Sequence, residues 1–186
     1  GDSLLNIWHH PNFKFIKGDI TSLDFIETVF KDNKIEAVVH LAAIVGDPAC
    51  AKQPELARKV NWEASMNLLD LSVRNGTKRF IFASTCSNYG KMSGSNGYVK
   101  ETSPLVPVSL YAKLKVKFEN VILNEMKKKD NFCPTSLRFS TVYGISPRMR
   151  FDLTVNEFTK ELVLGRELEV FGEQFWRPYC HVYDFA

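Results

Sequence analysis

Two kinds of hydrophobic pattern alternate along the chain. Apolar runs of about five residues are typical of strands, whereas longer stretches with apolar residues three or four positions apart are typical of helices. We expect strands at the apolar runs 37–41 and 79–83, at 13–17, where apolar and basic residues alternate, and at 135–139 and 168–171. The longer stretches predict helices at 22–31, 54–74, 108–129 and 152–164. Strands that alternate with helices indicate an α/β fold, a doubly wound parallel sheet with helices on both faces.

Residue types at the segment ends support these helices. Pro54 stands at the first position of the long helix 54–74 and Gly76 just after its last, which is the usual arrangement at the two ends of a helix. Ser22 is a suitable N-cap for the helix 22–31. The polar, glycine-rich segment 91–97 predicts a surface loop.

The composition is that of a soluble globular protein. The 186 residues are 45% hydrophobic and 24% charged, and the formal net charge of +3 is too small to favour nucleic acid. The basic run 127–129 fits the end of a helix, where the helix dipole favours cations. No apolar run reaches the roughly 20 residues that a membrane span needs, and no signal peptide is visible. The 4 cysteines lack metal-ligand spacing, so we expect a cytoplasmic protein with reduced thiols, no metal and no membrane partner.

Small and hydroxyl residues follow the predicted strands. These residues are Gly18-Asp19-Ile20, Leu41-Ala42-Ala43, Ser84-Thr85-Cys86-Ser87 and Ser140-Thr141. Ligands of a parallel sheet bind beyond the carboxyl ends of its strands. Each segment alone also fits ordinary turn chemistry, but together they predict a site for a flat ligand that lies close to the backbone.

Tyr111 and Lys115 lie four positions apart in the predicted helix 108–129, so they share one face. A free phenol, with a pKa near about 10, is a poor base at neutral pH. A cation held nearby favours the phenolate and lowers that pKa. The pair is therefore a candidate proton shuttle for an alcohol that loses hydride, with Thr85 upstream. The same spacing also fits a half-buried tyrosine and a solvated lysine on an ordinary helix, and the surrounding segments decide between the two.

Those surrounding segments match one family in order. The matching segments are Gly18-Asp19-Ile20, Leu41-Ala42-Ala43 with the strand before it, Val60-Asn61, 84–90, Tyr111 with Lys115, 137–144 and 177–184. Together they resemble an extended short-chain dehydrogenase/reductase, and within that superfamily a nucleotide-sugar epimerase/dehydratase similar to the UDP-glucose 4-epimerases.

The resemblance implies a Rossmann-like fold with two parts. Residues 1–144 would form the dinucleotide-binding domain and residues 145–186 part of a smaller nucleotide-sugar-binding lobe. The family opens with a strand, a Gly-x-x-Gly-x-x-Gly loop and a helix, whose backbone amides approach the cofactor pyrophosphate. This N-terminal glycine-rich unit is missing from the chain, which is therefore expected to be an internal fragment.

The resemblance also implies which residues form the site. Thr85, Tyr111 and Lys115 would be catalytic. NAD, or NADP, would contact Asp19, Ile20, Leu41, Ala42, Ala43, Asn61, Ser84, Tyr111, Lys115 and Phe139. The nucleotide-diphosphate sugar would contact Ser87, Thr141, Phe171 and Arg177. Arg177 also fits a surface ion pair and Phe171 a core position, and Thr141 stands where related epimerases often have Asn.

The implied reaction is NAD-dependent epimerisation of a UDP-hexose at C4 through a 4-keto intermediate, with Tyr111 as base. A 4,6-dehydratase of the family carries Asp-Glu after the threonine, where this chain has Cys86-Ser87, so that reaction is less favoured. An NADPH-dependent 4-keto-sugar reductase and a non-catalytic truncated module remain as alternatives. The resemblance further implies a homodimer that packs through the helices 54–74 and 108–129.

Overall fold

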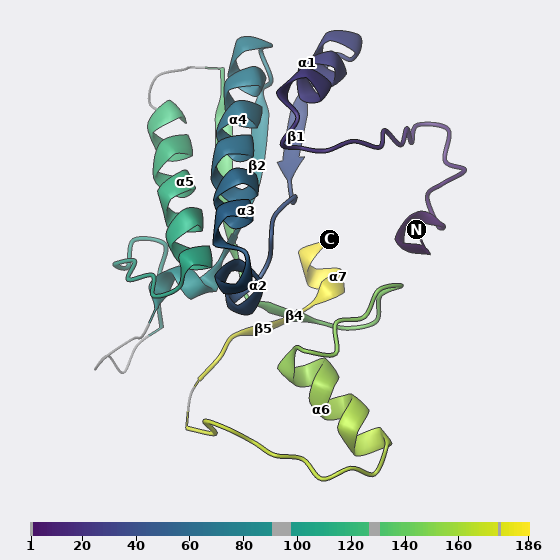
Figure 1. Ribbon diagram of the computed structural model, residues 1–186, viewed down its shortest axis with the longest axis vertical. Helices are drawn as coiled ribbons and strands as arrows, with labels where there is room; N and C mark the ends of the chain where they lie inside the picture. The colour runs from purple at the N-terminus through teal and green to yellow at the C-terminus, as the bar shows by residue number, and fades with distance from the viewer. Residues whose placement is uncertain (1, 91–97, 127–130, 175) are drawn as a thin grey trace. The chain divides into compact units, whose positions relative to one another are not determined.

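The computed structural model describes residues 2–90, 98–126, 131–174 and 176–186. They form two compact units, Lys17–Phe139 and a second made of Gly1–Ile16 with Ser140–Ala186. Figure 1 shows their elements, and each unit is described by itself. The expected division into a dinucleotide-binding domain (1–144) and a sugar-binding lobe (145–186) is defined by ligand binding, and it stays a prediction.

A parallel sheet forms the centre of the unit Lys17–Phe139. Its described strands are β1 (Ala37–His40), β2 (Arg79–Thr85) and β3 (Cys133–Phe139), in the order β1-β2-β3. All neighbours are parallel, so the carboxyl ends of the strands lie at one edge of the sheet. The predicted strands at 37–41, 79–83 and 135–139 are confirmed, and so is the α/β fold class.

Helices precede and connect these strands. The helices are α1 (Leu23–Asp32), α2 (Asp47–Lys52), α3 (Pro54–Arg58), α4 (Ser65–Arg74) and α5 (Leu110–Met126), and all of them except α2 match segments that the sequence predicts to be helical. A π-helical segment, Lys59–Ala64, joins α3 to α4, so the predicted helix 54–74 is one stretch with a π-helical middle. Ser22 occupies the N-cap position of α1, although its side chain makes no capping hydrogen bond. The expected loop 91–97 and the basic run 127–129 lie outside the described residues.

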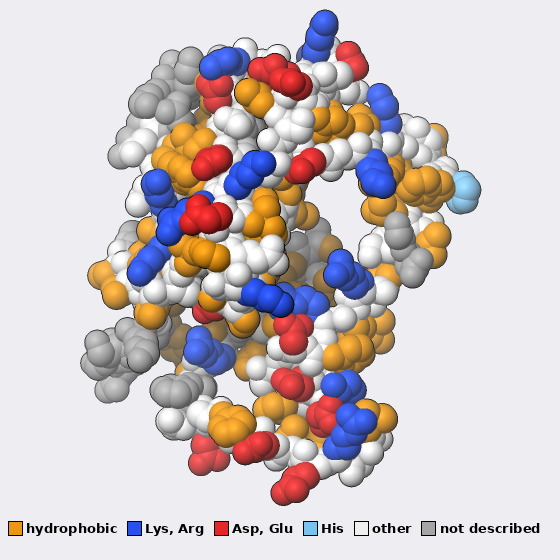
Figure 2. Space-filling model, viewed as in Figure 1, with side chains coloured by type: hydrophobic (Ala, Val, Ile, Leu, Met, Phe, Trp, Pro, Cys, Tyr) orange, Lys and Arg blue, Asp and Glu red, His pale blue; other side chains and the backbone are white. Residues whose placement is uncertain are grey.

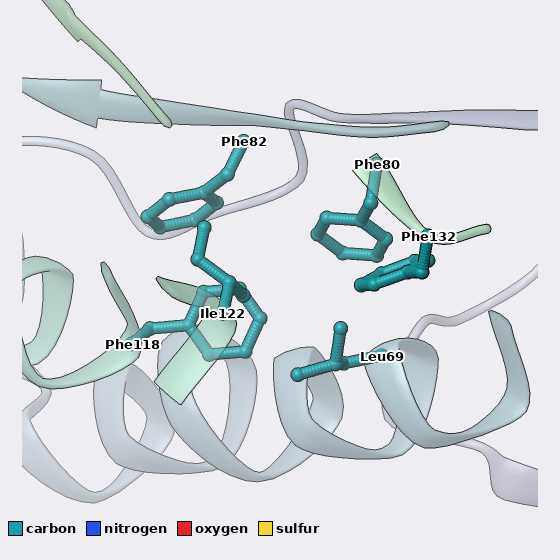
Figure 3. Close-up of a cluster of buried hydrophobic side chains, with 6 residues drawn as sticks. All are labelled: Leu69, Phe80, Phe82, Phe118, Ile122 and Phe132. Carbon is teal, nitrogen blue, oxygen red and sulfur yellow. The ribbon is translucent and has the colours of Figure 1, made fainter. Parts of the chain in front are cut away.

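The core of this unit lies between the sheet and the helices α4 and α5. Figure 3 shows its six buried side chains: Leu69, Phe80, Phe82, Phe118, Ile122 and Phe132. Phe82 and Phe118 meet edge to face, with ring centroids 4.7 Å apart. Burying a large apolar side chain contributes roughly 2–3 kcal/mol, so this cluster holds α5 firmly against β2.

The two faces of the sheet differ in burial. The helices α4 and α5 lie over one face of the sheet (Figure 1). Phe80 and Phe82 pack against side chains of these helices. On the other face Val39 is 58% exposed and Leu137 is 37% exposed. The predicted parallel sheet with helices is thus confirmed, and within β1 only His40 is fully buried.

The second unit contains a small parallel sheet of β4 (Thr141–Tyr143) and β5 (Tyr179–His181). Its helices are the 3₁₀ turn η1 (Asp2–Leu4), α6 (Thr154–Val163) and the short α7 (Val182–Phe185). The predicted helix 152–164 is confirmed. The predicted strands at 13–17 and 168–171 are wrong, because neither segment pairs with a described strand and an extended segment becomes a strand only through such pairing.

The outer side of the helices carries charges of both signs. Figure 2 shows acidic and basic side chains interspersed with apolar ones over α4 and α5. On α4, Arg74 pairs with Asp70 at 2.7 Å between nitrogen and oxygen. Among the described helices, none combines the length and apolar character that a membrane crossing requires.

Candidate active site

The α5 helix carries Tyr111 and Lys115 in its first turns. The Ser109 hydroxyl accepts a hydrogen bond of 3.2 Å from the Ala112 amide, which is the typical contact of a residue that starts a helix. Ala112 is 1% exposed and Phe118 is fully buried, so this side of α5 faces the sheet. The helix therefore turns Lys115, three positions after Ala112, inward as well.

Lys115 is a buried cation at the end of β2. The residue is only 4% exposed, and its Nζ donates a hydrogen bond of 2.6 Å to the Ala83 carbonyl oxygen. The same Nζ lies 4.5 Å from the centre of the Phe82 ring and 5.7 Å from that of Tyr111. Burial lowers the pKa of Lys115 from 10.5 to about 8. The structure thus brings this ammonium group close to the Tyr111 ring.

Thr85 ends β2 and begins the 3₁₀ turn η3 (Cys86–Tyr89). It is 8% exposed, and its Oγ1 accepts a hydrogen bond of 3.2 Å from the Ser87 amide. Gly90 closes this turn with a φ of +66°. A Cβ at Gly90 would lie 1.8 Å from the Val106 carbonyl oxygen, so only glycine fits there. These local contacts hold the hydroxyl residues Thr85 and Ser87 at the carboxyl end of the sheet.

The residues expected at the cofactor lie mostly around the strand ends. Leu41 and Ala42 are exposed just after β1, and Ile20 and Ala43 are half-buried. Phe139 is the last residue of β3. Ser84 differs, because it is 4% exposed and its hydroxyl donates to the Glu119 carboxylate.

Asp19 presents an exposed carboxylate before α1. Its Oδ1 accepts hydrogen bonds from the Thr21 amide at 2.8 Å and from the Thr21 hydroxyl at 3.0 Å. These bonds hold the pKa of Asp19 below its ordinary value. The group is therefore a charged acceptor at neutral pH.

Asn61 lies in the π-helical segment and braces the loop after β1. Its Oδ1 accepts from the Ile44 amide at 2.8 Å, and its Nδ2 donates to the Ile44 carbonyl oxygen at 2.9 Å. The side chain thereby imitates a strand pairing with Ile44. Its action on a cofactor would pass through that loop, and remains a prediction.

Three of the expected substrate residues belong to the second unit and are described within it. Thr141 begins β4, where its amide donates a hydrogen bond of 3.2 Å to the Pro178 carbonyl oxygen. This contact brings β4 next to the segment that carries Arg177. Arg177 is exposed, and Phe171 is 82% exposed. The interpretation of Phe171 as a core residue is therefore wrong. Ser87, the fourth expected substrate residue, belongs to the first unit and is half-buried.

Sequence reasoning missed three residues that surround the Thr85 turn. They are Asn88, Glu119 and Arg138. Asn88 and Arg138 both donate hydrogen bonds to the Glu119 carboxylate, and Asn88 also donates to the Ser84 hydroxyl. Glu119 follows Lys115 by four positions, and this spacing from a candidate catalytic lysine is the signal that could have identified it.

No group of His, Cys, Asp or Glu side chains within the described parts of the chain could hold a metal ion. His40 is 3% exposed and contacts the Ser65 hydroxyl at 2.8 Å from its Nε2. Burial, with a further contribution from Lys115, lowers the pKa of His40 to about 4. It is a neutral packed residue at pH 7.

Comparison with protein families supports the assignment from the residues. The model of the NAD dependent epimerase/dehydratase family matches residues 3–186. The UDP-glucuronate 4-epimerase of Thermodesulfobacterium geofontis is 32% identical over 177 residues, which cover 94% of this chain and 53% of that protein. The UDP-glucose 4-epimerase of Lacticaseibacillus casei is 32% identical over 195 residues, covering 95% of this chain and 57% of that protein. The chain thus spans about half the length of the curated relatives it matches.

Solved structures show the same fold. The UDP-glucuronic acid 4-epimerase of Bacillus cereus, solved with UDP-glucuronic acid and NAD, has a TM-score of 0.81 at 28% identity. The match covers 98% of this chain and 56% of that one. The UDP-glucose 4-epimerase of Thermotoga maritima, solved with UDP-glucose, has a TM-score of 0.79 at 30% identity, with 94% and 57% covered.

Proposed function

The chain belongs to the NAD-dependent epimerase/dehydratase family, and from this premise we propose that the full-length protein epimerises a UDP-hexose at C4 through a 4-keto intermediate. The observation that carries the proposal is the buried Lys115 ammonium, which lies 5.7 Å from the centre of the Tyr111 ring. A cation at this distance favours the phenolate form of a tyrosine. Tyr111 is thereby the proposed base.

NAD is the proposed cofactor, and the chemistry of the residues present fits it. The exposed Asp19 carboxylate can accept from an adenine amino group, while Lys115 can donate to ribose hydroxyls. The small exposed residues after β1 allow a flat ring system to approach the backbone. The full proposed set is Asp19, Ile20, Leu41, Ala42, Ala43, Asn61, Ser84, Tyr111, Lys115 and Phe139. When bound, NAD supplies the oxidation of the sugar at C4 and its reversal.

Residues of this chain would transfer the proton of the C4 hydroxyl group. Tyr111 accepts the proton of the C4 hydroxyl and returns it at the end of the reaction. Lys115 stabilises the negative charge on Tyr111. Since Thr85 Oγ1 accepts from the Ser87 amide, its O–H can still donate to the sugar oxygen and align it.

The second unit supplies the proposed contacts to the nucleotide diphosphate. Arg177 can bind two phosphate oxygens at once, because its guanidinium group presents a planar fork of donors. The exposed Phe171 can stack on the base, with Thr141 and Ser87 as further polar contacts. Cys86-Ser87 replaces the Asp-Glu pair of the dehydratases, which supports epimerisation over loss of water.

We also propose a cytoplasmic homodimer. No disulfide joins Cys50, Cys86, Cys133 or Cys180, which agrees with a reducing compartment. The helices α4 and α5 pack against each other (Figure 1) and would form the dimer interface together with the π-helical segment and α3.

The test is to incubate the full-length protein with UDP-glucose, UDP-galactose or UDP-glucuronate without added cofactor. We expect interconversion of the C4 epimers, detected by chromatography of the sugars. Steady NADPH consumption on a 4-keto sugar, with no interconversion, would contradict epimerisation and favour a reductase.

The base is tested by Tyr111→Phe, which removes only the hydroxyl group. We expect the rate to fall at least about 100-fold, since general base catalysis contributes roughly 10²–10⁴-fold. Tyr98→Phe is the matched control, because Tyr98 is fully exposed. An unchanged rate in Tyr111→Phe would show that another group is the base.

A further inference from the structure

A buried carboxylate lies one helical turn beyond Lys115 on α5. Glu119 is 1% exposed, and its carboxylate oxygens accept hydrogen bonds from four donor groups. The donors are the Ser84 hydroxyl, Asn88 Nδ2 at 2.7 Å, Arg138 Nε at 3.0 Å and Arg138 Nη2 at 2.8 Å. Every one of these donors comes from an element other than α5, so Glu119 is a point where several elements are joined.

Two of the donors stand on either side of the turn that carries Thr85. Ser84 precedes the residues 85–87 and Asn88 follows them, and both donate to the same oxygen, Oε1 of Glu119. Asn88 Nδ2 also donates to the Ser84 hydroxyl at 3.0 Å. The two ends of the turn are therefore held by a single atom of α5.

The same face of the helix carries the candidate base. Tyr111, Lys115 and Glu119 follow one another at intervals of four residues, so they lie along one face of α5. A displacement of Glu119 relative to Ser84 would change the position of Thr85 relative to Tyr111. Both hydroxyl groups must reach one sugar oxygen in the proposed reaction.

Arg138 completes the network from β3. It binds Glu119 through two nitrogens and donates from Nη1 to the Tyr89 hydroxyl and to the Glu101 carbonyl oxygen, each at 3.0 Å. A buried ion pair contributes little net stability compared with apolar residues of similar size. Its directional bonds do define one geometry, which indicates a role in placing the turn.

We propose that Glu119 is a positioning residue that sets the Thr85–Ser87 turn against Tyr111 and Lys115. The proposal rests on the proposed function to the extent that Thr85 and Tyr111 act on the same oxygen. It goes beyond that function because Glu119, Ser84 and Asn88 act through their neighbours and need no contact with the sugar.

The kinetic test uses Glu119→Gln and the milder Ser84→Ala in the full-length protein. We expect kcat to fall about 10–100-fold in Glu119→Gln and less in Ser84→Ala, since small misplacements of reacting groups can cost about 100-fold. KM should stay within about twofold, because Arg177, Phe171 and Thr141, which make most of the proposed contacts to the nucleotide, lie outside the turn.

Phe132→Leu is the control for loss of stability alone. Phe132 belongs to the core cluster of the same unit, and its side chain carries no hydrogen-bonding group that could join the carboxylate network. Its substitution should lower the unfolding temperature and leave kcat unchanged at 25 °C. Equal losses of kcat in Phe132→Leu and Glu119→Gln would overturn the proposal, and so would values of kcat within twofold of the wild type in both Glu119→Gln and Ser84→Ala.

Amide hydrogen exchange tests the same proposal without any activity. We expect Glu119→Gln to speed exchange about tenfold in residues 84–90, where the Ser87 amide is held by Thr85. Exchange in residues 79–83 should not change. Unchanged exchange in 84–90 would contradict the positioning role, even if the protein proved to have no epimerase activity and the proposed function failed.

Discussion

Lys115 illustrates how one residue can serve a site and weaken the fold. Its ammonium group is buried between α5 and β2, and burial lowers its pKa to about 8. The unfolded chain therefore binds more protons than the folded chain between pH 8 and 10.5, and stability rises with pH across that window. Below it the cost of burying the charge is fully present, roughly 3 kcal/mol.

Replacing Lys115 by Met should therefore stabilise the protein at pH 7. The Ala83 carbonyl loses its donor and Phe82 loses a cation contact, which offsets part of the gain, so we expect a net increase of about 1 kcal/mol or more. The proposed epimerase activity should be lost at the same time. Urea unfolding followed by circular dichroism measures the change in the free energy of unfolding. A less stable Lys115→Met variant would show that the buried charge does not destabilise the fold.

His40 gives the protein a dependence on acid pH. Its pKa is lowered from 6.5 to about 4, so between these values the unfolded chain binds a proton that the folded chain does not. Its contribution is fully present above pH 6.5 and falls as the pH drops towards 4, by up to roughly 3 kcal/mol.

The expected result is a shallower loss of stability between pH 6.5 and 4.5 in His40→Gln than in the wild type. Stability is measured by urea unfolding at several pH values. His9→Gln is the matched control, because His9 is exposed. Parallel curves for His40→Gln and the wild type would show that His40 does not cause the acid dependence.

At the scale of elements, the π-helical segment Lys59–Ala64 ties the long helix to the loop after β1. π-Helical turns inside α-helices are rare and occur frequently at functional sites. Here the segment presents Asn61 to both backbone groups of Ile44. The helix is thus linked to the loop that carries the expected cofactor residues.

Asn61→Ala should destabilise the protein by about 2–3 kcal/mol, because it leaves the Ile44 amide and carbonyl without these partners. The control is Asn120→Ala on the exposed side of α5, for which we expect a change within about 0.5 kcal/mol. Urea unfolding at pH 7 compares the two. Equal effects of the two substitutions would show that the Ile44 contacts contribute little.

The prediction of elements succeeded where local pattern and tertiary pairing agree. The segments at 79–83 and 135–139 lie between predicted helices and are paired in the sheet. The segments 13–17 and 168–171 have a similar pattern but no strand partner among the described residues. Pairing depends on residues far away in the chain, so a local pattern cannot decide it.

At the scale of the whole molecule, the proposed dimer is a property of the outer helix surface. Leu123 on α5 is 37% exposed. The outer surface of the helices carries charges of both signs (Figure 2). Apolar side chains on such a surface are suited to the core of an interface.

We expect the full-length protein to sediment as a dimer at about 10 µM, since oligomer formation depends on concentration. Leu123→Asp should shift it towards the monomer. Leu162→Asp, which changes a 62% exposed leucine of α6 in the second unit, should leave the dimer intact. A monomeric wild type at this concentration would contradict the proposal.

The sequence by itself determined the α/β class, the main strands and helices, and the candidate Thr85, Tyr111 and Lys115, because periodicity and motif spacing are local properties. Only the tertiary structure decided that Lys115 is buried with a lowered pKa and that Ser84 faces Glu119 instead of the surface. It also showed that Asn88, Glu119 and Arg138 form one network. Burial and long-range hydrogen bonds arise when β2, α5 and β3 pack together, and a glutamate on a helix looks the same in sequence whether it meets solvent or an arginine.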